Sequence, residues 1–212
     1  MNTSAMNTLE QVLVTSPVVA VIRGVTSELE KTLTWLMSVG VRAVEVTTNT
    51  PDWQQGVGLA ISQGFAQVGV GTVVTEDHVQ QAHDAGATFT VAPGLNARVA
   101  LACRAHGLIH VPGVMTPSEI QAALGMGIST LKLFPAGPLG IDYLRALRAP
   151  FNEVRFIPTG GVSLASASDW IAAGAFAVGL GGALTESGAD SNDQTSRLLR
   201  SLTGASTAEP KL

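Results

Sequence analysis

Short β-branched runs alternate with longer amphipathic stretches eight times along the chain, at a repeat of about 20 to 27 residues. This alternation predicts an α/β chain in which each strand leads into a helix. The expected strands are Val18–Arg23, Ala43–Thr47, Gln67–Val70, Phe89–Ala92, Ile109–Pro112, Thr130–Phe134, Arg155–Pro158 and Phe176–Leu180.

Helical periodicity occupies several of the segments between these strands. One of the expected helices begins with a capping box, in which Pro117 takes the first helical position and Glu119 faces Thr116. Glycine after the last turn supplies the left-handed cap of most of them. The expected helices are Glu28–Val39, His78–Ala85, Ala97–Ala105, Ser118–Met126 and Ala167–Ala173, and the closing glycines are Gly40, Gly86, Gly107, Gly127 and Gly174.

Strand–helix units of this kind form either a closed barrel or an open doubly wound sheet. Eight units match the (β/α)8 TIM barrel, and no Gly-x-Gly-x-x-Gly motif follows the first strand. We therefore expect a single (β/α)8 barrel domain over residues 1–212. An extra N-terminal helix around Leu9–Val14 is expected at the bottom of the barrel, and residues 205–212 are expected to form a flexible tail.

Composition narrows the classes of partner and compartment. The chain is 46% hydrophobic, carries a formal net charge of −4 and contains a single cysteine, Cys103. No run of like charges forms a basic surface for nucleic acid or an anionic membrane. One cysteine allows no internal disulfide, and Met1–Pro17 lacks the features of a signal peptide. We expect a cytoplasmic protein without nucleic-acid or membrane partners.

The histidines and the cysteine do not predict a metal site. His78 and His83 are five residues apart and do not share a helical face, and His106 and His110 span a helix-to-strand turn. We expect His110 to be a core or rim group with satisfied hydrogen bonds, and Cys103 to be a packed thiol. Neither a metal nor another cofactor is expected.

Two ionisable residues interrupt the apolar strands. Alternation along Thr130–Phe134 places Lys132 on the face opposite Leu131 and Leu133, which points it into the barrel. Glu45 interrupts the second strand, and the even-numbered strands share interior layers, so the two residues can face each other. A desolvated amine can attack a ketone, and a buried carboxyl group can move protons. A structural ion pair is the alternative.

Glycine pairs follow the last two expected strands, where barrels commonly bind phosphate. The backbone N–H groups of Gly160 and Gly161, and of Gly181 and Gly182, can approach an anion closely, although a simple turn is the alternative for each pair.

Further polar candidates follow the first strands of the chain. Arg23 and Thr72 could hold a carboxylate, as a charged fork and a neutral donor respectively. A rim salt bridge is the alternative for Arg23, and turn formation is the alternative for Thr72 and Asn49. Pro93, in an Ala-Pro-Gly sequence, is a further candidate.

Several motifs resemble those of the 2-keto-3-deoxy-6-phosphogluconate and 4-hydroxy-2-oxoglutarate aldolases, including their 6-phosphogalactonate relatives. The likeness runs from Pro17 to about Leu184. The resemblance implies a Schiff-base aldolase that uses no cofactor and assembles as a homotrimer. Such an aldolase releases pyruvate and glyceraldehyde 3-phosphate from a phosphorylated keto-deoxy sugar acid. The motifs that carry it are Val44–Thr47, Gly69–Val73, Val91–Gly94, Leu131–Ala136 and Pro158–Val162.

The resemblance also assigns roles to residues. It implies that Lys132 forms the Schiff base, that Glu45 is the proton shuttle and that Thr72 binds the pyruvate moiety. Thr159 is implied to lie near the substrate hydroxyl groups. The glycines implied to hold phosphate are Gly160, Gly161, Gly181 and Gly182.

Two positions depart from the family pattern. Asn49 stands where phosphogluconate-type members carry an arginine, whereas phosphogalactonate-type members have Asn there and an arginine like Arg23. Thr159 is similar to the phosphogluconate type, so both epimers stay open as substrates. Gly182 replaces a phosphate-binding serine, which keeps 4-hydroxy-2-oxoglutarate open too. An isomerase with Glu45 as its base and a non-catalytic phosphosugar-binding barrel also stay open as functions.

Overall fold

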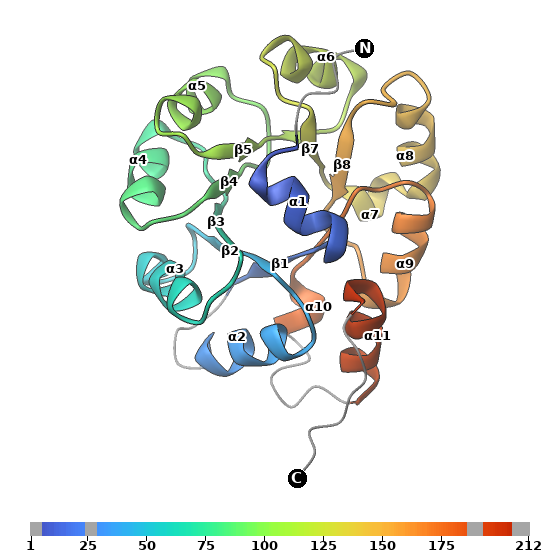
Figure 1. Cartoon of the computed structure of the whole chain (residues 1–212). Coiled ribbons are helices and arrows are strands. Elements are labelled where there is room, and N and C mark those ends of the chain that lie inside the picture. Colours follow the sequence, from blue (N-terminus) through green and yellow to red (C-terminus); the bar gives the residue numbers. More distant parts are fainter. Residues whose placement is uncertain (1–5, 24–28, 186–192, 205–212) are drawn as a thin grey trace.

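The computed structural model describes residues 6–23, 29–185 and 193–204. The expected tail over residues 205–212 and the first residue of one expected helix, Glu28, lie outside these ranges. Figure 1 shows strands gathered at the centre of the molecule and helices around them. None of the helices in the described ranges is long and apolar enough to cross a membrane.

Every pair of neighbouring strands is parallel, and the strands form two sheets, in the orders β5-β4-β3-β2-β1-β9 and β6-β7-β8. The strands are β1 (Val18–Ile22), β2 (Ala43–Thr47), β3 (Gln67–Gly71), β4 (Phe89–Val91), β5 (Ile109–Val111), β6 (Gly113–Val114), β7 (Thr130–Leu133), β8 (Arg155–Pro158) and β9 (Val178–Leu180).

The two sheets meet at both of their edges. On one side the chain runs from β5 through Pro112 into β6. On the other side Thr159, which follows β8, forms a parallel bridge with Gly179 of β9. The result is a curled parallel sheet with helices outside it, consistent with a TIM-like barrel (Figure 1).

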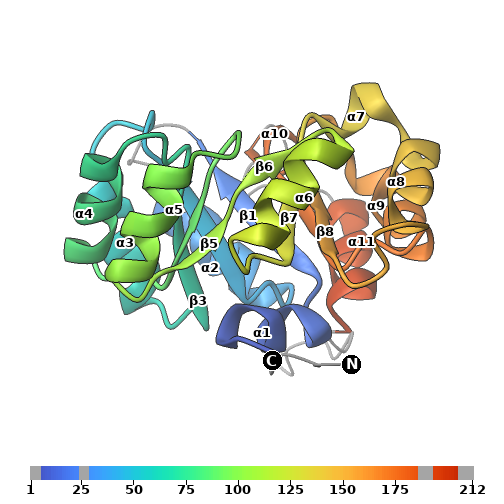
Figure 2. The ribbon, with the colours of Figure 1, turned by 90° about the horizontal axis from the view of Figure 1, so that it is seen from above.

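Most helices lie outside the curled sheet, whereas α1 lies across one end of it (Figures 1 and 2). The helices are α1 (Thr8–Thr15), α2 (Leu29–Ser38), α3 (Trp53–Ser62), α4 (Glu76–Asp84), α5 (Ala97–Ala105), α6 (Pro117–Gly125), α7 (Ala136–Leu139), α8 (Ile141–Arg148), α9 (Leu164–Ala172), α10 (Gly182–Thr185) and α11 (Asp193–Thr203).

The expected caps of the helices are confirmed. Thr116 and Glu119 form a capping box at the start of α6, with Pro117 in the first turn. The five closing glycines all have positive φ angles, from 68° at Gly107 to 97° at Gly174. These angles are strained for side chains with a Cβ, so glycine is the residue that ends each helix most easily.

Some element boundaries differ from the expected ones. β1 ends at Ile22 instead of Arg23, and β9 begins at Val178 instead of Phe176. The expected strand Ile109–Pro112 is divided into β5 and β6 at Pro112. Proline has no N–H to donate to a neighbouring strand, so a ladder is interrupted there.

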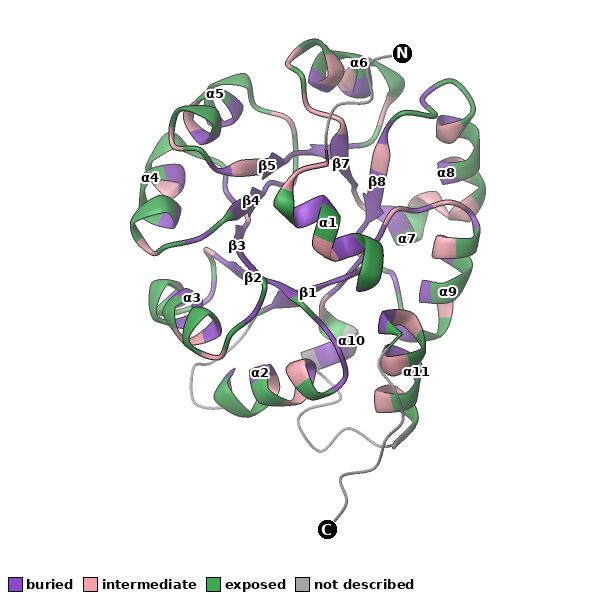
Figure 3. Cartoon of the chain, viewed as in Figure 1, coloured by how far each residue is buried: buried purple, intermediate pink, exposed green. Residues whose placement is uncertain are grey.

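Alternation along the strands separates an inner from an outer core. Leu131 and Leu133 belong to the large outer cluster, together with buried residues of the surrounding helices. Figure 3 shows this pattern, in which the strands and the inward faces of the helices are buried. Lys132 lies between these two leucines and is therefore directed to the inside of the curled sheet.

Helix α1 closes the lower end of the inner core. Leu9 and Leu13 pack into the inner cluster with Val19, Phe89 and Ile157. The helix is also held by Glu10, a buried carboxylate that accepts a hydrogen bond from Thr130 of β7. Helix α1 thus closes the inner core from below, through apolar and polar contacts together.

Candidate active site

Lys132 and Glu45 lie inside the curled sheet, on β7 and β2 respectively. Their exposed fractions are 4% and 2%, so both ionisable groups are almost fully removed from water. Both line an interior cavity of about 10 Å³, which Thr159 lines as well. The structure thus brings together three of the residues selected from the sequence.

Burial shifts the pKa values of this pair in opposite directions. Desolvation lowers the pKa of Lys132, although the nearby Glu45 carboxylate acts to raise it. Desolvation raises the pKa of Glu45, while Lys132 and Arg23 act to lower it. Both shifts favour the neutral form, so the site favours an uncharged amine beside a carboxyl group that can carry a proton.

The amine and the carboxyl group are close enough to interact but do not form a contact ion pair. The ion pairs within 4.0 Å among the described residues do not include one between Lys132 and Glu45. Space therefore remains between the two groups. The cavity beside them has about the volume that one water molecule needs.

Two residues that were not selected from the sequence shape this site. A Cβ atom on Gly71 would lie 2.6 Å from Oε1 of Glu45, so the glycine makes room for the carboxyl group. Nζ of Lys132 lies 4.8 Å from the centroid of the Phe134 ring. Alternation along the strand gave a signal for Phe134, whereas Gly71 looked like any other glycine at a strand end.

Thr159 is held beside the pair by the junction of the two sheets. Its side chain is buried, and Oγ1 donates a hydrogen bond to the carbonyl oxygen of Ile157 at 3.2 Å. A Cβ atom on Gly179 would lie 2.2 Å from this hydroxyl oxygen. The close approach of β8 and β9 at this point therefore depends on a glycine at position 179.

The glycine pairs form neighbouring loops beyond β8 and β9. Gly160 and Gly161 have φ angles of 81° and 80°, and the carbonyl of Gly160 accepts a 2.8 Å hydrogen bond from the N–H of Gly137. Gly181 follows β9, and Gly182 begins α10. None of these four glycines lines the cavity beside Lys132.

The other candidates lie on the rim, after the ends of their strands. Arg23 is exposed, but its positive charge lowers the pKa of both Lys132 and Glu45. Asn49 is exposed in the turn after β2, and Pro93 is exposed after β4. Thr72 has a positive φ of 61°, and its carbonyl accepts a 3.0 Å hydrogen bond from the Thr48 hydroxyl.

His110 corrects one expectation. Nδ1 is 2.9 Å from Oγ1 of Thr90, but the buried Nε2 has no hydrogen-bond partner among the described residues, so this histidine is only half satisfied. Burial lowers the pKa of His110 to about 4. Cys103 is a buried thiol, as expected. Within the described ranges, no three His, Cys, Asp or Glu residues are grouped so as to hold a metal.

The chain is similar to a known protein family and to individual aldolases. Residues 9–200 match the family model described as "KDPG and KHG aldolase". The 2-dehydro-3-deoxy-phosphogluconate aldolase of Treponema pallidum is 43% identical over 140 residues, which cover 65% of this chain and 66% of that protein. A probable 2-dehydro-3-deoxy-6-phosphogalactonate aldolase of Rhizobium meliloti is 33% identical, and the match covers 88% of this chain and 90% of that protein.

A solved structure is similar over nearly the whole chain. It is the KDPG aldolase of Legionella pneumophila, with pyruvate captured at low pH as a covalent carbinolamine intermediate. Its sequence is 30% identical, its TM-score is 0.76, and the match covers 93% of this chain and 98% of that one.

Proposed function

The chain belongs to the KDPG and KHG aldolase family, and from this premise we propose that it is a class I aldolase that uses Lys132 and Glu45. Its proposed substrate is 2-dehydro-3-deoxy-6-phosphogluconate or the 6-phosphogalactonate epimer, and its products are pyruvate and glyceraldehyde 3-phosphate. Enzymes of this kind are carbon–carbon lyases.

One observation carries the proposal. An amine and a carboxyl group face each other inside an apolar barrel. Burial lowers the pKa of the amine and raises the pKa of the carboxyl group, and both shifts favour the neutral form of the group. A free amine at ordinary pH is the nucleophile that an imine mechanism needs. The relative whose pyruvate complex is a covalent carbinolamine supports the same chemistry for this chain.

In the proposed mechanism, Nζ of Lys132 attacks the C2 ketone to form a carbinolamine. The Glu45 carboxyl group gives its proton to the carbinolamine hydroxyl group, which leaves as water, so that an iminium ion and the Glu45 carboxylate result. Glu45, through a water molecule, accepts the proton of the C4 hydroxyl group. The C3–C4 bond then breaks, its electron pair enters the iminium system as an enamine, and the aldehyde leaves. Glu45 returns the proton to C3, and water hydrolyses the imine to release pyruvate and the free amine.

The remaining candidates are proposed to bind the ends of the substrate. Arg23 and Thr72 would hold the carboxylate, with Asn49 and Pro93 beside them on the same rim. Thr159, which lines the cavity with Lys132, would contact the substrate hydroxyl groups. The backbone N–H groups of the neighbouring glycine loops would hold the phosphate; these glycines are Gly160, Gly161, Gly181 and Gly182.

A second candidate substrate is 4-hydroxy-2-oxoglutarate. Gly182 offers no hydroxyl group to a phosphate, and the matching family model includes KHG aldolases by name. A coupled assay of pyruvate release with the phosphogluconate, phosphogalactonate and hydroxyoxoglutarate substrates separates the possibilities. The preferred substrate is the one with the highest kcat/KM, because this ratio measures discrimination between competing substrates.

Borohydride reduction in the presence of pyruvate tests the mechanism. The wild-type chain is expected to lose activity and to gain one reduced pyruvate adduct on Lys132, as measured by peptide mass spectrometry. Lys132→Met is expected to take up no adduct and to lose activity at least about a thousandfold, because the nucleophile is absent. Lys31→Met, at an exposed lysine of α2, is the matched control and should behave as wild type.

Two outcomes contradict the imine mechanism. Full activity without an adduct after reduction would exclude it, and substantial activity of Lys132→Arg would favour an isomerase that uses Glu45 alone. A phosphosugar-binding barrel without catalysis would retain ligand binding in Lys132→Met and release no pyruvate in any variant.

At the level of the whole protein, we propose that residues 1–212 form one closed (β/α)8 domain that works in the cytoplasm as a homotrimer. The pairing of β8 with β9 and the continuity of β5 with β6 support a closed barrel. The family resemblance supports the trimer, and light scattering coupled to gel filtration measures it directly.

A further inference from the structure

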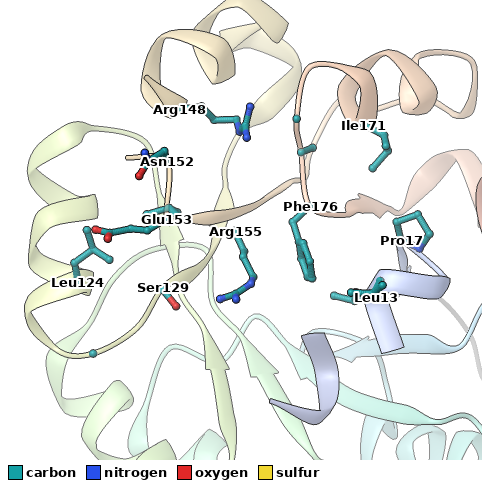
Figure 4. Close-up of a pocket in the computed structure, with 15 residues that line it drawn as sticks. Leu13, Pro17, Leu124, Ser129, Arg148, Asn152, Glu153, Arg155, Ile171 and Phe176 are labelled. Carbon is teal, nitrogen blue, oxygen red and sulfur yellow. The ribbon is translucent and has the colours of Figure 1, made fainter. Parts of the chain in front are cut away.

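A cleft of about 900 Å³ opens beside α1, at the end of the barrel where β7, β8 and β9 begin. It is lined by residues that precede or start these strands, among them Ser129, Arg155 and Phe176, whereas the cavity of Lys132 lies inside the barrel. The volume falls in the range of about 300 to 1,000 Å³ that is typical of small-molecule sites. Figure 4 shows the side chains that surround it.

Arg155 presents a fixed cation to this cleft. Its Nη1 lies 3.4 Å from Oε1 of the buried Glu10, and its guanidinium lies 5.8 Å from the centroid of the Phe176 ring. Figure 4 shows the side chains of Arg155 and Phe176 side by side. A guanidinium has five N–H donors, so the single contact with Glu10 leaves most of them available to a further acceptor.

Arg148, the last residue of α8, brings a second cation into the same cleft. Its side chain lies across Gly174, where a Cβ atom would come within 2.1 Å of Nη1. Arg148 is half-buried, and within the described ranges its guanidinium forms no hydrogen bond or ion pair. A partly desolvated cation without an anionic partner favours the binding of an anion.

The other walls of the cleft indicate the chemical character of the rest of the ligand. Leu13, Pro17, Ile171 and Phe176 provide apolar surface in the same cleft as the two arginines. Glu153 is the acidic residue of the lining, and Figure 4 shows its side chain extending toward Leu124, away from Arg148. Two guanidinium groups beside an apolar wall suit a ligand that has an anionic group and a hydrophobic part.

We propose that this cleft is a second binding site, for a small organic anion. The carboxylate or phosphate group of the ligand is held by Arg148 and Arg155, and its apolar part lies against Phe176, Leu13 and Ile171. The site is separate from the cavity of Lys132 and does not depend on the proposed aldolase reaction. A guanidinium binds both carboxylate and phosphate oxygens in a bidentate manner, so the probes below distinguish these two groups.

Isothermal titration calorimetry with benzoate and phenyl phosphate tests the proposal. Both probes have an aromatic body and an anionic group, and phenol and benzamide serve as neutral counterparts. At least one anion is expected to bind with a stoichiometry of one per chain, equally well to wild type and to Lys132→Met. The tighter of the two anions identifies the group that the arginines select.

Arg148→Gln should weaken binding about tenfold, because a charge-assisted hydrogen bond is lost. Arg145→Gln is the matched control: it lies on the same helix, faces Asp142 instead of the cleft, and should leave the affinity unchanged. If Arg148→Gln does not fold, as judged by circular dichroism, Arg148→Lys replaces it. That variant keeps the charge, loses the planar fork, and is expected to bind phenyl phosphate or benzoate several-fold more weakly.

Four results would overturn the proposal. These are the absence of saturable binding by either anion, equal binding of the neutral counterparts, equal affinity of the Arg148 and Arg145 variants, and loss of binding in Lys132→Met. The last result would mean that the probe binds at the candidate active site instead of the cleft.

Discussion

At the scale of single residues, the candidate site depends on two groups that burial drives toward neutrality while their charges attract each other. Desolvation is the larger influence on both Lys132 and Glu45, and the attraction between them opposes it. Arg23 favours the free amine as well, because a nearby positive charge disfavours the ammonium form. Three residues, on β7, on β2 and directly after β1, thus determine whether the amine is reactive.

Glu45→Gln tests this electrostatic coupling. The turnover number is expected to fall by about 10² to 10⁴, because the group that transfers protons is lost. The carboxylate raises the pKa of Lys132, so its removal lowers that pKa. The free-amine fraction rises with pH through this pKa, so imine formation with pyruvate should reach its plateau at a lower pH in the variant.

The measurement is the rate of borohydride-trapped adduct formation as a function of pH. Glu30→Gln, at an exposed glutamate of α2, is the control and should give the wild-type profile. A profile of Glu45→Gln that moves to higher pH, or does not move, would show that Glu45 does not act on the amine.

At the scale of elements, α1 is the part of the chain that closes the inner core. Its capping box, formed by Asn7 and Glu10, fixes where the helix begins. Leu13 faces the inner core and is fully buried, whereas the next residue, Val14, is 60% exposed. Substitutions of these two neighbours therefore test the buried face and the exposed face of the same helix.

Leu13→Ala is expected to lower the free energy of unfolding by about 2 to 5 kcal/mol, because it leaves a cavity in the inner core. Val14→Ala should change it by less than about 0.5 kcal/mol, because the side chain is mostly in water. Urea unfolding followed by circular dichroism measures both. Equal effects of the two substitutions would mean that α1 does not pack against the barrel in solution.

Local signals explain which elements the sequence revealed. Five closing glycines and the capping box at Thr116 marked helix ends correctly. The alternation predicts a helix between the second and third strands, but no bounds were assigned to it. In this helix, α3, Asp52 at the N-cap has a φ of 52° and forms no side-chain capping bond. Two glycines inside that helix, Gly56 and Gly58, weaken its helical pattern further. Packing against the sheet stabilises α3, and that contribution is not local.

At the scale of the whole molecule, the junction of β8 with β9 both joins the two sheets and places Thr159 beside Lys132. Gly179 allows the contact, because a Cβ atom there would lie 2.2 Å from the Thr159 hydroxyl. The shape of the barrel and the shape of the site are therefore coupled at this point.

Gly179→Ala is expected to destabilise the fold by about 1 to 3 kcal/mol through overpacking, and to lower kcat because Thr159 is displaced. Gly58→Ala is the control, since nothing lies within 4 Å of the added methyl group in α3. It should raise the stability by up to about 1 kcal/mol and leave kcat unchanged. Urea unfolding and the pyruvate-release assay measure the two effects, and equal behaviour of the variants would contradict the proposed contact.

The sequence by itself determined the alternation of strands and helices, the inward direction of Lys132 and Glu45, and the glycine loops after the last strands. These features follow from periods of two and 3.6 residues and from the steric freedom of glycine, which act over a few neighbouring residues. The tertiary structure decided which distant groups meet: Gly71 with Glu45, Gly179 with Thr159, and Arg148 with Gly174. Such contacts depend on how the chain closes in space, because burial and electrostatic coupling are properties of neighbours that lie far apart in the sequence.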